Sequence, residues 1–214
     1  DRLNEGYGLS PAALARFADD HPRARLVVTV DCGITADSAL RAFRADGREV
    51  IVTDHHLPDA SRPPADACAV VNPHLPGTPA ECEALCGAGV AFKLACALWK
   101  TGKAADRDAA RKWDPKTWLD AVAVATVADV VPLTGENRLL VHAGLKRLRT
   151  RPSPGLKALL NKALATAEPP TSRHLAFLLG PRLNAAGRMC DARPALELLR
   201  TRDEDEARAL AVRL

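Results

Sequence analysis

The sequence predicts an α/β fold in which a parallel-sheet βαβ lobe precedes a mostly helical lobe. Two short runs, residues 26–30 and 49–53, are rich in β-branched residues and lack polar alternation, as is typical of strands buried on both faces of a parallel sheet. The segment between them has apolar residues at helical spacing, which predicts a βαβ unit with a right-handed crossover. We therefore expect one lobe over residues 1–80 and a second, helical lobe over residues 81–214.

In the first lobe, the crossover helix is expected over residues 35–46. Thr35 is its expected N-cap, because a threonine hydroxyl can accept a hydrogen bond from the first turn of a helix. Gly47 follows as a stop signal. A third strand is expected at residues 68–72, and it completes a small parallel sheet.

In the second lobe, helices are expected where apolar residues recur at helical spacing between proline-rich breaks. They cover residues 88–101, 116–131, 136–150, 154–166, 172–179 and 191–200, and another begins at the acidic run from residue 203. Within the second of these helices, residues 118–131 are apolar nearly all round, which indicates burial on every side.

The chemistry of the chain is expected where the first two strands end. Asp31 follows the first apolar run, and Asp54, His55 and His56 follow the second. Ligands of parallel sheets bind beyond the carboxyl ends of the strands, and neighbouring strands lie about 4.8 Å apart. Asp31 and His55 are therefore predicted to share a metal ion. An isolated Asp-His-His triplet is more often an ordinary loop, but its position after a buried strand favours the metal site.

A third carboxylate is expected from the apolar helix. Asp120 and Asp129 are nine residues apart, so at about 100° per residue they point to opposite sides and cannot serve one site. Asp129 lies in the apolar run just before Pro132, where a buried carboxylate needs a cation or a shifted pKa. We predict that Asp129 is the third metal ligand and that Asp120 is an exposed or helix-capping acid.

Carboxylate and imidazole ligands together favour Mn²⁺, Mg²⁺ or a similar ion, whereas structural zinc usually recruits thiolates. Two such ions about 3.5–4 Å apart can generate hydroxide and stabilise both oxygens of an in-line displacement at phosphorus. The residues thus predict metal-dependent phosphoryl chemistry.

Six strings of the sequence occur in an order that is characteristic of one superfamily. They are residues 28–35, 52–58, 70–74, 86–93, 125–133 and 180–189. In this order they resemble the DHH phosphoesterase superfamily, over essentially the whole chain from Glu5 onward. The string Asn72-Pro-His74 and the string at residues 180–189 resemble the RecJ single-strand exonucleases rather than the short DHH phosphodiesterases.

The resemblance implies a DHH-type catalytic core and a metal-dependent exonuclease that hydrolyses single-stranded DNA in the 5′-to-3′ direction, in DNA repair and recombination. It implies Asp31, His55 and Asp129 as metal ligands and His56 as the histidine beside the scissile phosphate. Asp54 would orient a histidine or a bound water. The implied cofactors are Mn²⁺ or Mg²⁺, two ions in the complete protein, and the implied partners include a single-strand-binding protein and a helicase.

Two other functions stay open at this point. One is a DHH phosphodiesterase that acts on short oligonucleotides or cyclic dinucleotides, and the other is a non-catalytic nucleic-acid-binding scaffold. The first motif of the family, a strand that ends in an Asp-x-Asp pair, is absent from the chain. In the family this motif lies upstream, so we expect residues 1–214 to be an excerpt of a longer protein.

The distribution of charge favours a polyanionic partner. Residues 138–214 carry 15 Lys and Arg against 7 Asp and Glu, whereas residues 1–137 carry 15 against 19. A basic segment beside an acidic metal site suits a nucleic-acid backbone. For the basic run at residues 146–151, a solvated helix face is an equally good interpretation.

Two arginines are expected to contact phosphate directly. Arg182 and Arg188 are bracketed by glycines, which predicts a loop where backbone and guanidinium groups meet phosphate together, and Asn184 could add an amide contact. The alternative is that one of these arginines anchors the loop to Asp191. Arg2 is a further expected DNA contact, from its position in the family.

Composition indicates a globular protein in a reducing compartment. The chain is 47% hydrophobic, but no unbroken apolar segment is long enough to span a bilayer. Residues 1–20 lack the order of a signal peptide, and the six cysteines are expected to be reduced thiols. We therefore expect a cytoplasmic protein without a membrane partner.

Overall fold

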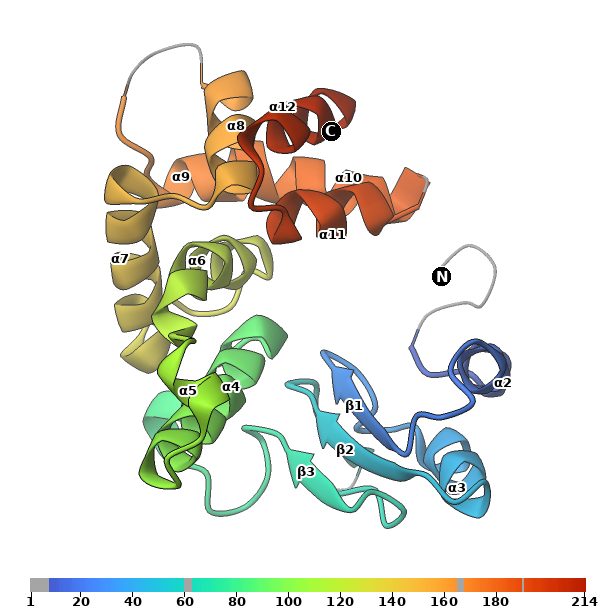
Figure 1. The fold of residues 1–214 in the computed structure, drawn as a ribbon. Coiled ribbons are helices and arrows are strands. Elements are labelled where there is room, and N and C mark those ends of the chain that lie inside the picture. The colour runs from blue at the N-terminus through green and yellow to red at the C-terminus, as the bar shows by residue number, and fades with distance from the viewer. Residues whose placement is uncertain (1–7, 60–62, 165–167, 190) are drawn as a thin grey trace. The chain divides into compact units, whose positions relative to one another are not determined.

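The computed structural model describes residues 8–59, 63–164, 168–189 and 191–214 (Figure 1). The chain divides into two compact units, Asp1–Ala91 and Phe92–Leu214. The division falls within helix α4 (Gly87–Ala104), beyond the lobe boundary expected at residue 80. The first unit holds the parallel sheet, and the second is helical.

The first unit confirms the predicted βαβ arrangement. Its elements are α2 (Pro11–Asp20), β1 (Leu26–Val30), α3 (Asp37–Ala45), β2 (Glu49–Thr53), β3 (Ala69–Val71) and the 3₁₀ turn η2 (Ala80–Cys82). The strands form a three-stranded parallel sheet in the order β1-β2-β3. Val28 of β1 lies opposite Ile51 of β2, and Ile51 lies opposite Ala69 of β3. The first two strands have the predicted bounds, and the third is shorter than predicted.

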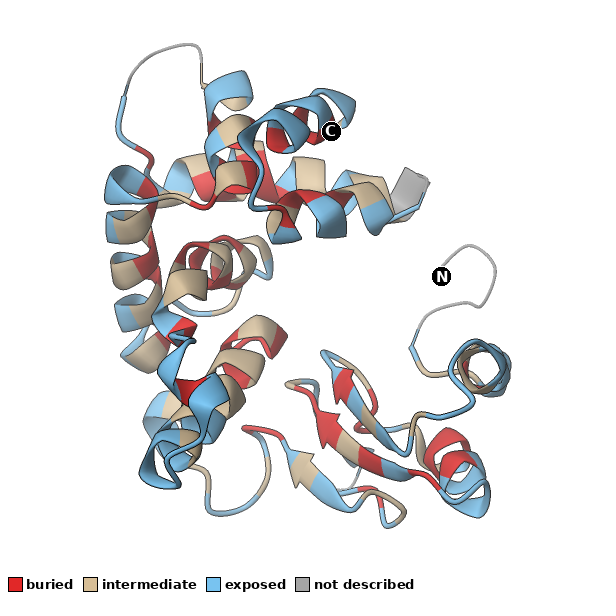
Figure 2. Cartoon of the chain, in the orientation of Figure 1, coloured by how far each residue is buried: buried red, intermediate tan, exposed pale blue. Residues whose placement is uncertain are grey.

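One face of this sheet packs against helices α2 and α3 (Figure 1). The shared core consists of Leu14, Ala39, Leu40, Phe43, Val50 and Val52. On β1, however, Leu26, Val28 and Val30 are 51%, 45% and 52% exposed. The expectation that both strands are buried on both faces is therefore wrong for β1, which is an outer strand of the three that the structure describes. Of the three described strands, only the central strand β2 is covered along most of its length (Figure 2).

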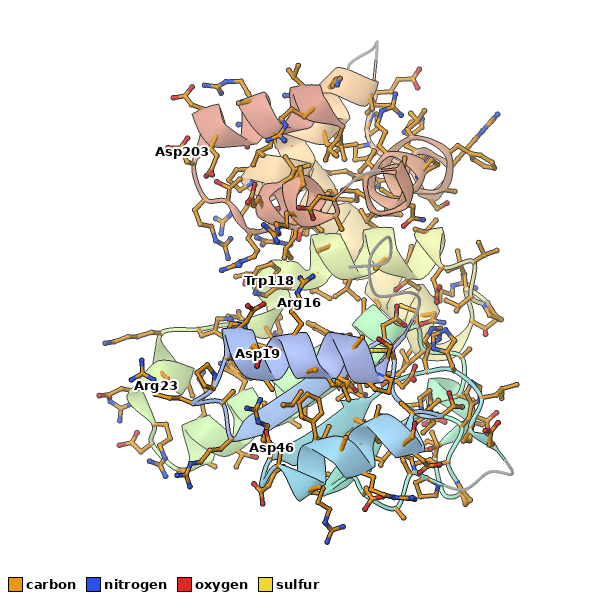
Figure 3. The ribbon with its side chains drawn as sticks, turned by 90° about the vertical axis from the view of Figure 1, so that its right-hand side faces the viewer. Arg16, Asp19, Arg23, Asp46, Trp118 and Asp203 are labelled. Carbon is orange, nitrogen blue, oxygen red and sulfur yellow. The ribbon has the colours of Figure 1, made fainter. Side chains whose placement is uncertain are left out.

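Helix α2 shows how local sequence sets an element of this unit. Ser10 caps it, because the serine hydroxyl accepts a hydrogen bond from the Ala13 amide at 3.1 Å. Leu14 points into the core, whereas Arg16 and Asp19 lie on the exposed side of the helix (Figure 3). This division is the amphipathic pattern expected of a helix that covers a sheet.

The start of α3 differs from the prediction. The helix begins at Asp37, and its N-cap Ala36 makes no side-chain cap, so the prediction of Thr35 as N-cap is wrong. The cause is tertiary: the Ile34 amide donates to the Asp54 carboxylate at 3.0 Å, and the Ala36 amide donates to the Gly33 carbonyl. The chain therefore makes a turn across the end of β1 before the helix starts.

The second unit is helical, as predicted. It contains the rest of α4, then α5 (Asp108–Arg111), η3 (Pro115–Trp118), α6 (Leu119–Ala128), α7 (Gly135–Thr150), α8 (Pro154–Ala163), α9 (Ser172–His174), the π-helical turn η4 (Leu175–Leu179), α10 (Gly180–Met189), α11 (Arg193–Arg200) and α12 (Glu204–Arg213). Leucines from α8, η4 and α11 form the centre of its core, and Leu156, Leu175 and Leu198 are fully buried (Figure 2).

Asp120 is not the exposed or capping acid that the sequence predicts. It is 1% exposed, its carboxylate accepts a hydrogen bond from the Ser153 amide at 2.7 Å, and Arg147 Nε lies 3.6 Å away. Helix α7 and the segment after it pack against the first turn of α6, which makes this position interior. The carboxylate therefore satisfies a buried backbone N–H, a role that a helical-wheel argument cannot reveal.

Candidate metal centre

The parallel register brings the ends of the three strands to one edge of the sheet. Val30 is paired with Thr53, so Asp31 and Asp54 are the next residues on neighbouring strands. The Asp31 amide donates to the Thr53 carbonyl at 3.0 Å, and the Asp54 amide donates to the Val71 carbonyl at 3.1 Å. The residues that follow β1 and β2 are therefore held side by side at the carboxyl edge of the sheet by backbone hydrogen bonds.

Asp31, His55 and His56 form a compact group at this edge. Asp31 Oδ1 lies 3.1 Å from His55 Nε2, and one ligand atom from each of the three residues lies within 4.8 Å of the others. The His55 side chain is 14% exposed and that of Asp31 is 57% exposed, so the group is open to solvent on one side. One carboxylate and two imidazoles suit a borderline divalent ion such as Mn²⁺ better than a thiolate-seeking ion.

Asp54 lies beneath this group and is buried. Its Oδ1 accepts hydrogen bonds from the His55 amide at 2.7 Å, the His56 amide at 3.2 Å and His56 Nδ1 at 2.7 Å. Burial raises the pKa of Asp54, but the bonds from the Ile34 amide and from His56 and His55 outweigh it, so the net pKa lies below its ordinary value. Asp54 is thus an ionised anchor that fixes the His56 ring at Nδ1 and leaves Nε2 for another partner.

Asp31 is held in an unusual backbone conformation. Its φ is 63°, in the left-handed region that non-glycine residues adopt only at a cost of about 1–2 kcal/mol. Such strain persists where the surrounding structure imposes it, and it clusters at functional sites. Here the turn after β1 imposes it and directs the Asp31 carboxylate toward His55.

Gly87, the first residue of α4, closes the other side of Asp31. A β-carbon at position 87 would lie 2.2 Å from Asp31 Oδ1 and 2.6 Å from its Cγ, so only a glycine lets the helix come this close. The helix start also places the positive end of the backbone dipole beside the carboxylate. From the sequence, residues 86–93 predict only the start of a helix and a string of the family resemblance. The contact of Gly87 with Asp31 was not predicted.

Asp129 lies in the second unit, so its approach to Asp31 and His55 stays a prediction. Helix α6 ends at Ala128, and Asp129 is its exposed C-cap. The expectation that Asp129 is buried deep in an apolar helix is therefore wrong. The helix ends early because Val130, a residue that is 87% exposed, takes a left-handed φ of 60°.

The expected DNA-contacting loop is a helix. Arg182, Asn184 and Arg188 all lie on α10, which continues directly from the turn η4, where Leu175 and Leu179 are buried. Pro181 is tolerated in the first turn of a helix, and Gly180 has a right-handed helical backbone. Neither residue therefore interrupts the helix. The prediction of a loop is therefore wrong. The contacts of these residues with DNA stay a prediction.

Of the four residues predicted to contact DNA, the structure describes the side chains of two. Arg182 Nη1 donates to the Leu178 carbonyl at 2.8 Å, and Asn184 is exposed. Arg188 is part of the helix, but its side chain lies outside the described residues, as does the whole of Arg2. Asp191 was the alternative partner predicted for Arg182 or Arg188. In the structure its carboxylate lies 3.3 Å from Arg193 Nε.

Comparison with known proteins gives consistent relatives. The single-stranded-DNA-specific exonuclease RecJ of Dickeya dadantii is 43% identical over 216 residues, covering 99% of this chain and 37% of that protein. A crystal structure of exonuclease RecJ bound to manganese superposes with a TM-score of 0.81 at 39% identity, over 99% of this chain and 50% of that one. RecJ from Thermus thermophilus in complex with Mg²⁺ gives a TM-score of 0.59 at 30% identity, over 95% of this chain and 32% of that one.

The chain thus spans 37% of the length of the curated relative described above, and it covers its solved neighbours only in part. Among the described helices, none combines the length and apolar character needed to cross a membrane. The family model for the N-terminal domain of the DHH family matches residues 4–126. Because this match covers more than half of the sequence, the chain belongs to the DHH family.

Proposed function

We propose that the protein is a metal-dependent exonuclease that hydrolyses the phosphodiester bonds of single-stranded DNA in the 5′-to-3′ direction. The observation that carries the proposal is the grouping of Asp31, His55 and His56 at the carboxyl edge of the sheet. Its donor set suits Mn²⁺ or Mg²⁺, which serve phosphodiester hydrolysis. The RecJ relative, specific by name for single-stranded DNA, supports the substrate.

Each residue of the group has a distinct proposed role. Asp31 and His55 would hold the metal, and Asp129 would add a ligand from the second unit. The bound ions supply a hydroxide nucleophile and neutralise charge that develops on the leaving oxygen. The Asp31 carboxylate is preorganised for this role by its strained backbone and by the start of α4.

His56 acts on the substrate in this proposal. Its Nδ1 is bonded to Asp54, which leaves Nε2 for an oxygen of the scissile phosphate, and its side chain is 46% exposed. At that place Nε2 would form a hydrogen bond with the phosphate as negative charge accumulates. The hydrogen bond between the Asp54 carboxylate and Nδ1 restrains the ring from rotating.

A second ion needs further carboxylates. In the family these belong to an Asp-x-Asp pair at the end of a strand, and none of the three described strands is followed by such a pair. We propose that two-ion hydrolysis requires this motif in addition to Asp31, His55 and Asp129.

The substrate and partners follow from charge and from the relatives. Residues 138–214 carry the excess of Lys and Arg, and we propose that Arg182, Asn184 and Arg188 on α10, together with Arg2, contact DNA phosphates. A single-strand-binding protein and a helicase are proposed as partners in DNA repair and recombination, with the cytoplasm as location.

The test is a nuclease assay of the full-length gene product on a 3′-labelled, 5′-phosphorylated single strand, with Mn²⁺ or with a chelator. The expected result is stepwise shortening from the 5′ end that requires the metal. His55→Ala should lower both metal content and turnover, whereas His56→Ala should lower turnover much more than metal content. Hydrolysis restricted to cyclic dinucleotides or very short oligonucleotides, or DNA binding without hydrolysis, would overturn the proposal.

A further inference from the structure

Asn72 makes two hydrogen bonds that join neighbouring loops of the sheet edge. It follows β3 directly and is 5% exposed. Its Nδ2 donates to the His56 carbonyl at 2.9 Å, and its Oδ1 accepts from the His74 amide at 2.8 Å. The side chain therefore ties the loop that carries His56 to the turn after β3.

These bonds complement the contact between Asp54 and the His56 ring. Asp54 fixes the ring at Nδ1, and Asn72 fixes the peptide group of the same residue through its carbonyl oxygen. Asp54 also accepts from the His56 amide, so it restrains the peptide group before His56, whereas the peptide group after His56 is held by Asn72. Together the two contacts define where His56 Nε2 points.

The chemistry of this position requires an amide. One side of the group must donate, to a carbonyl, and the other must accept, from an N–H, and among short side chains only asparagine offers both in one plane. A buried amide is costly unless both ends are bonded, and both ends are bonded here. Pro73 disfavours the α region for the preceding residue, which keeps Asn72 extended at the end of β3.

We propose that Asn72 is a positioning residue for His56: its amide holds the peptide group of His56 so that Nε2 faces the scissile phosphate. The inference rests on the proposed function, because it assigns a partner to the histidine that acts on the substrate. Asn72 itself touches neither metal nor substrate in this proposal.

The test uses Asn72→Asp in the full-length gene product. This change keeps an acceptor for the His74 amide, replaces the donor to the His56 carbonyl by an oxygen and adds an ionisable carboxyl group. The turnover number should fall by about 10- to 100-fold, the size typical for loss of a partner that orients a catalytic-site ligand. The KM for single-stranded DNA and the Mn²⁺ content should stay at wild-type values, because Asp31 and His55 are unchanged.

A double variant separates positioning from general destabilisation. If Asn72 acts through His56, then Asn72→Asp causes no further loss of turnover in a His56→Ala background. Ser10→Ala is the matched stability control, since it removes the α2 cap in the same unit and should lower the melting temperature while leaving turnover unchanged. Equal turnover of Asn72→Asp and wild type, or multiplicative losses in the double variant, would overturn the inference.

Hydrogen exchange provides a readout that is independent of activity. Asn72→Asp should speed exchange in peptides spanning residues 54–58 and leave the peptide of β1 protected as in wild type. Unchanged exchange at residues 54–58 would refute the positioning role even if the protein cleaved no DNA. A wild-type protein that fails to cleave single-stranded DNA but shows the exchange difference would contradict the proposed function and leave the Asn72 contact supported.

Discussion

Replacing Gly87 with alanine should disable the metal site without unfolding the protein. The added β-carbon would lie 2.2 Å from Asp31 Oδ1 and 2.7 Å from Asp31 Cβ. An ordinary carbon–oxygen contact is about 3.3 Å, so the carboxylate or the helix start must move by about 1 Å. Asp31 is the part that yields, because its side chain is more than half exposed.

The expected magnitude follows from this displacement. Metal ligands must lie within about 0.2 Å of their ideal distances, so a shift of about 1 Å removes Asp31 from the coordination sphere. Defects of this kind weaken metal binding by about 10- to 100-fold, which corresponds to about 1.4–2.8 kcal/mol. The Mn²⁺ affinity of Gly87→Ala, measured by isothermal titration calorimetry, should fall by this factor.

Gly89→Ala is the matched control. It lies in the same helix, and its β-carbon would meet the flexible end of Leu85 at 3.1 Å rather than a carboxylate. Its Mn²⁺ affinity should stay within about twofold of wild type, a difference of about 0.4 kcal/mol. Wild-type affinity in Gly87→Ala, or equal weakening in both variants, would refute the steric argument.

Three other predictions concern charge, strain and pH. Arg188→Ala should weaken DNA binding and reduce the log–log salt slope of the affinity by about one unit, and an unchanged slope would remove Arg188 from the phosphate contacts. Val130→Gly should stabilise the protein by about 0.5–1 kcal/mol, because it relieves a left-handed φ of 60° at an 87% exposed side chain. Gly135→Ala, at a φ of 48°, should destabilise it, and urea titration of both variants measures the two changes. Because the folded-state pKa of Asp54 lies below its ordinary value, its carboxylate stabilises the fold above that value, and this stabilisation disappears as the pH falls through the folded pKa. In metal-free buffer, the stability difference between wild type and Asp54→Asn should therefore be largest near neutral pH and should shrink below about pH 4; a difference independent of pH would contradict this assignment.

The fold was largely predictable because its first unit follows local rules. The runs at residues 26–30 and 49–53 are β-branched, and the strands form at those bounds. Parallel strands have their carboxyl ends at one edge, so the meeting of Asp31 and His55 follows from the βαβ topology. The metal-binding roles of these residues remain predictions.

The errors arose where tertiary contacts override local signals. Thr35 fails as a cap because the carboxylate of Asp54 takes the Ile34 amide and delays the helix. Asp120 is buried because α7 and the segment after it pack against α6, and its carboxylate accepts a hydrogen bond from the Ser153 amide, 33 residues along the chain. Gly180 and Pro181 suggest a loop, yet the fully buried Leu179 just before them keeps the helix in the core.

The contacts of two contributors to the candidate site could not be predicted from periodicity. Gly87 touches Asp31, and Asn72 holds His56, across sequence separations that periodicity cannot detect. The strings that contain both residues were part of the family resemblance, but their physical roles emerge only from the packed structure. A glycine that opens a helix after a cysteine, and an asparagine that ends a strand before a proline, are the signals that could have directed attention to them.

The central claim is that a metal ion binds at the sheet edge between Asp31 and His55. The most direct measurement is the anomalous scattering of Mn²⁺ in crystals of the full-length gene product. The account predicts an anomalous peak within direct ligand distance of both Asp31 Oδ1 and His55 Nε2, with Asp54 bonded to the His56 ring. A fully occupied Mn²⁺ elsewhere, with no peak between these two side chains, would contradict it.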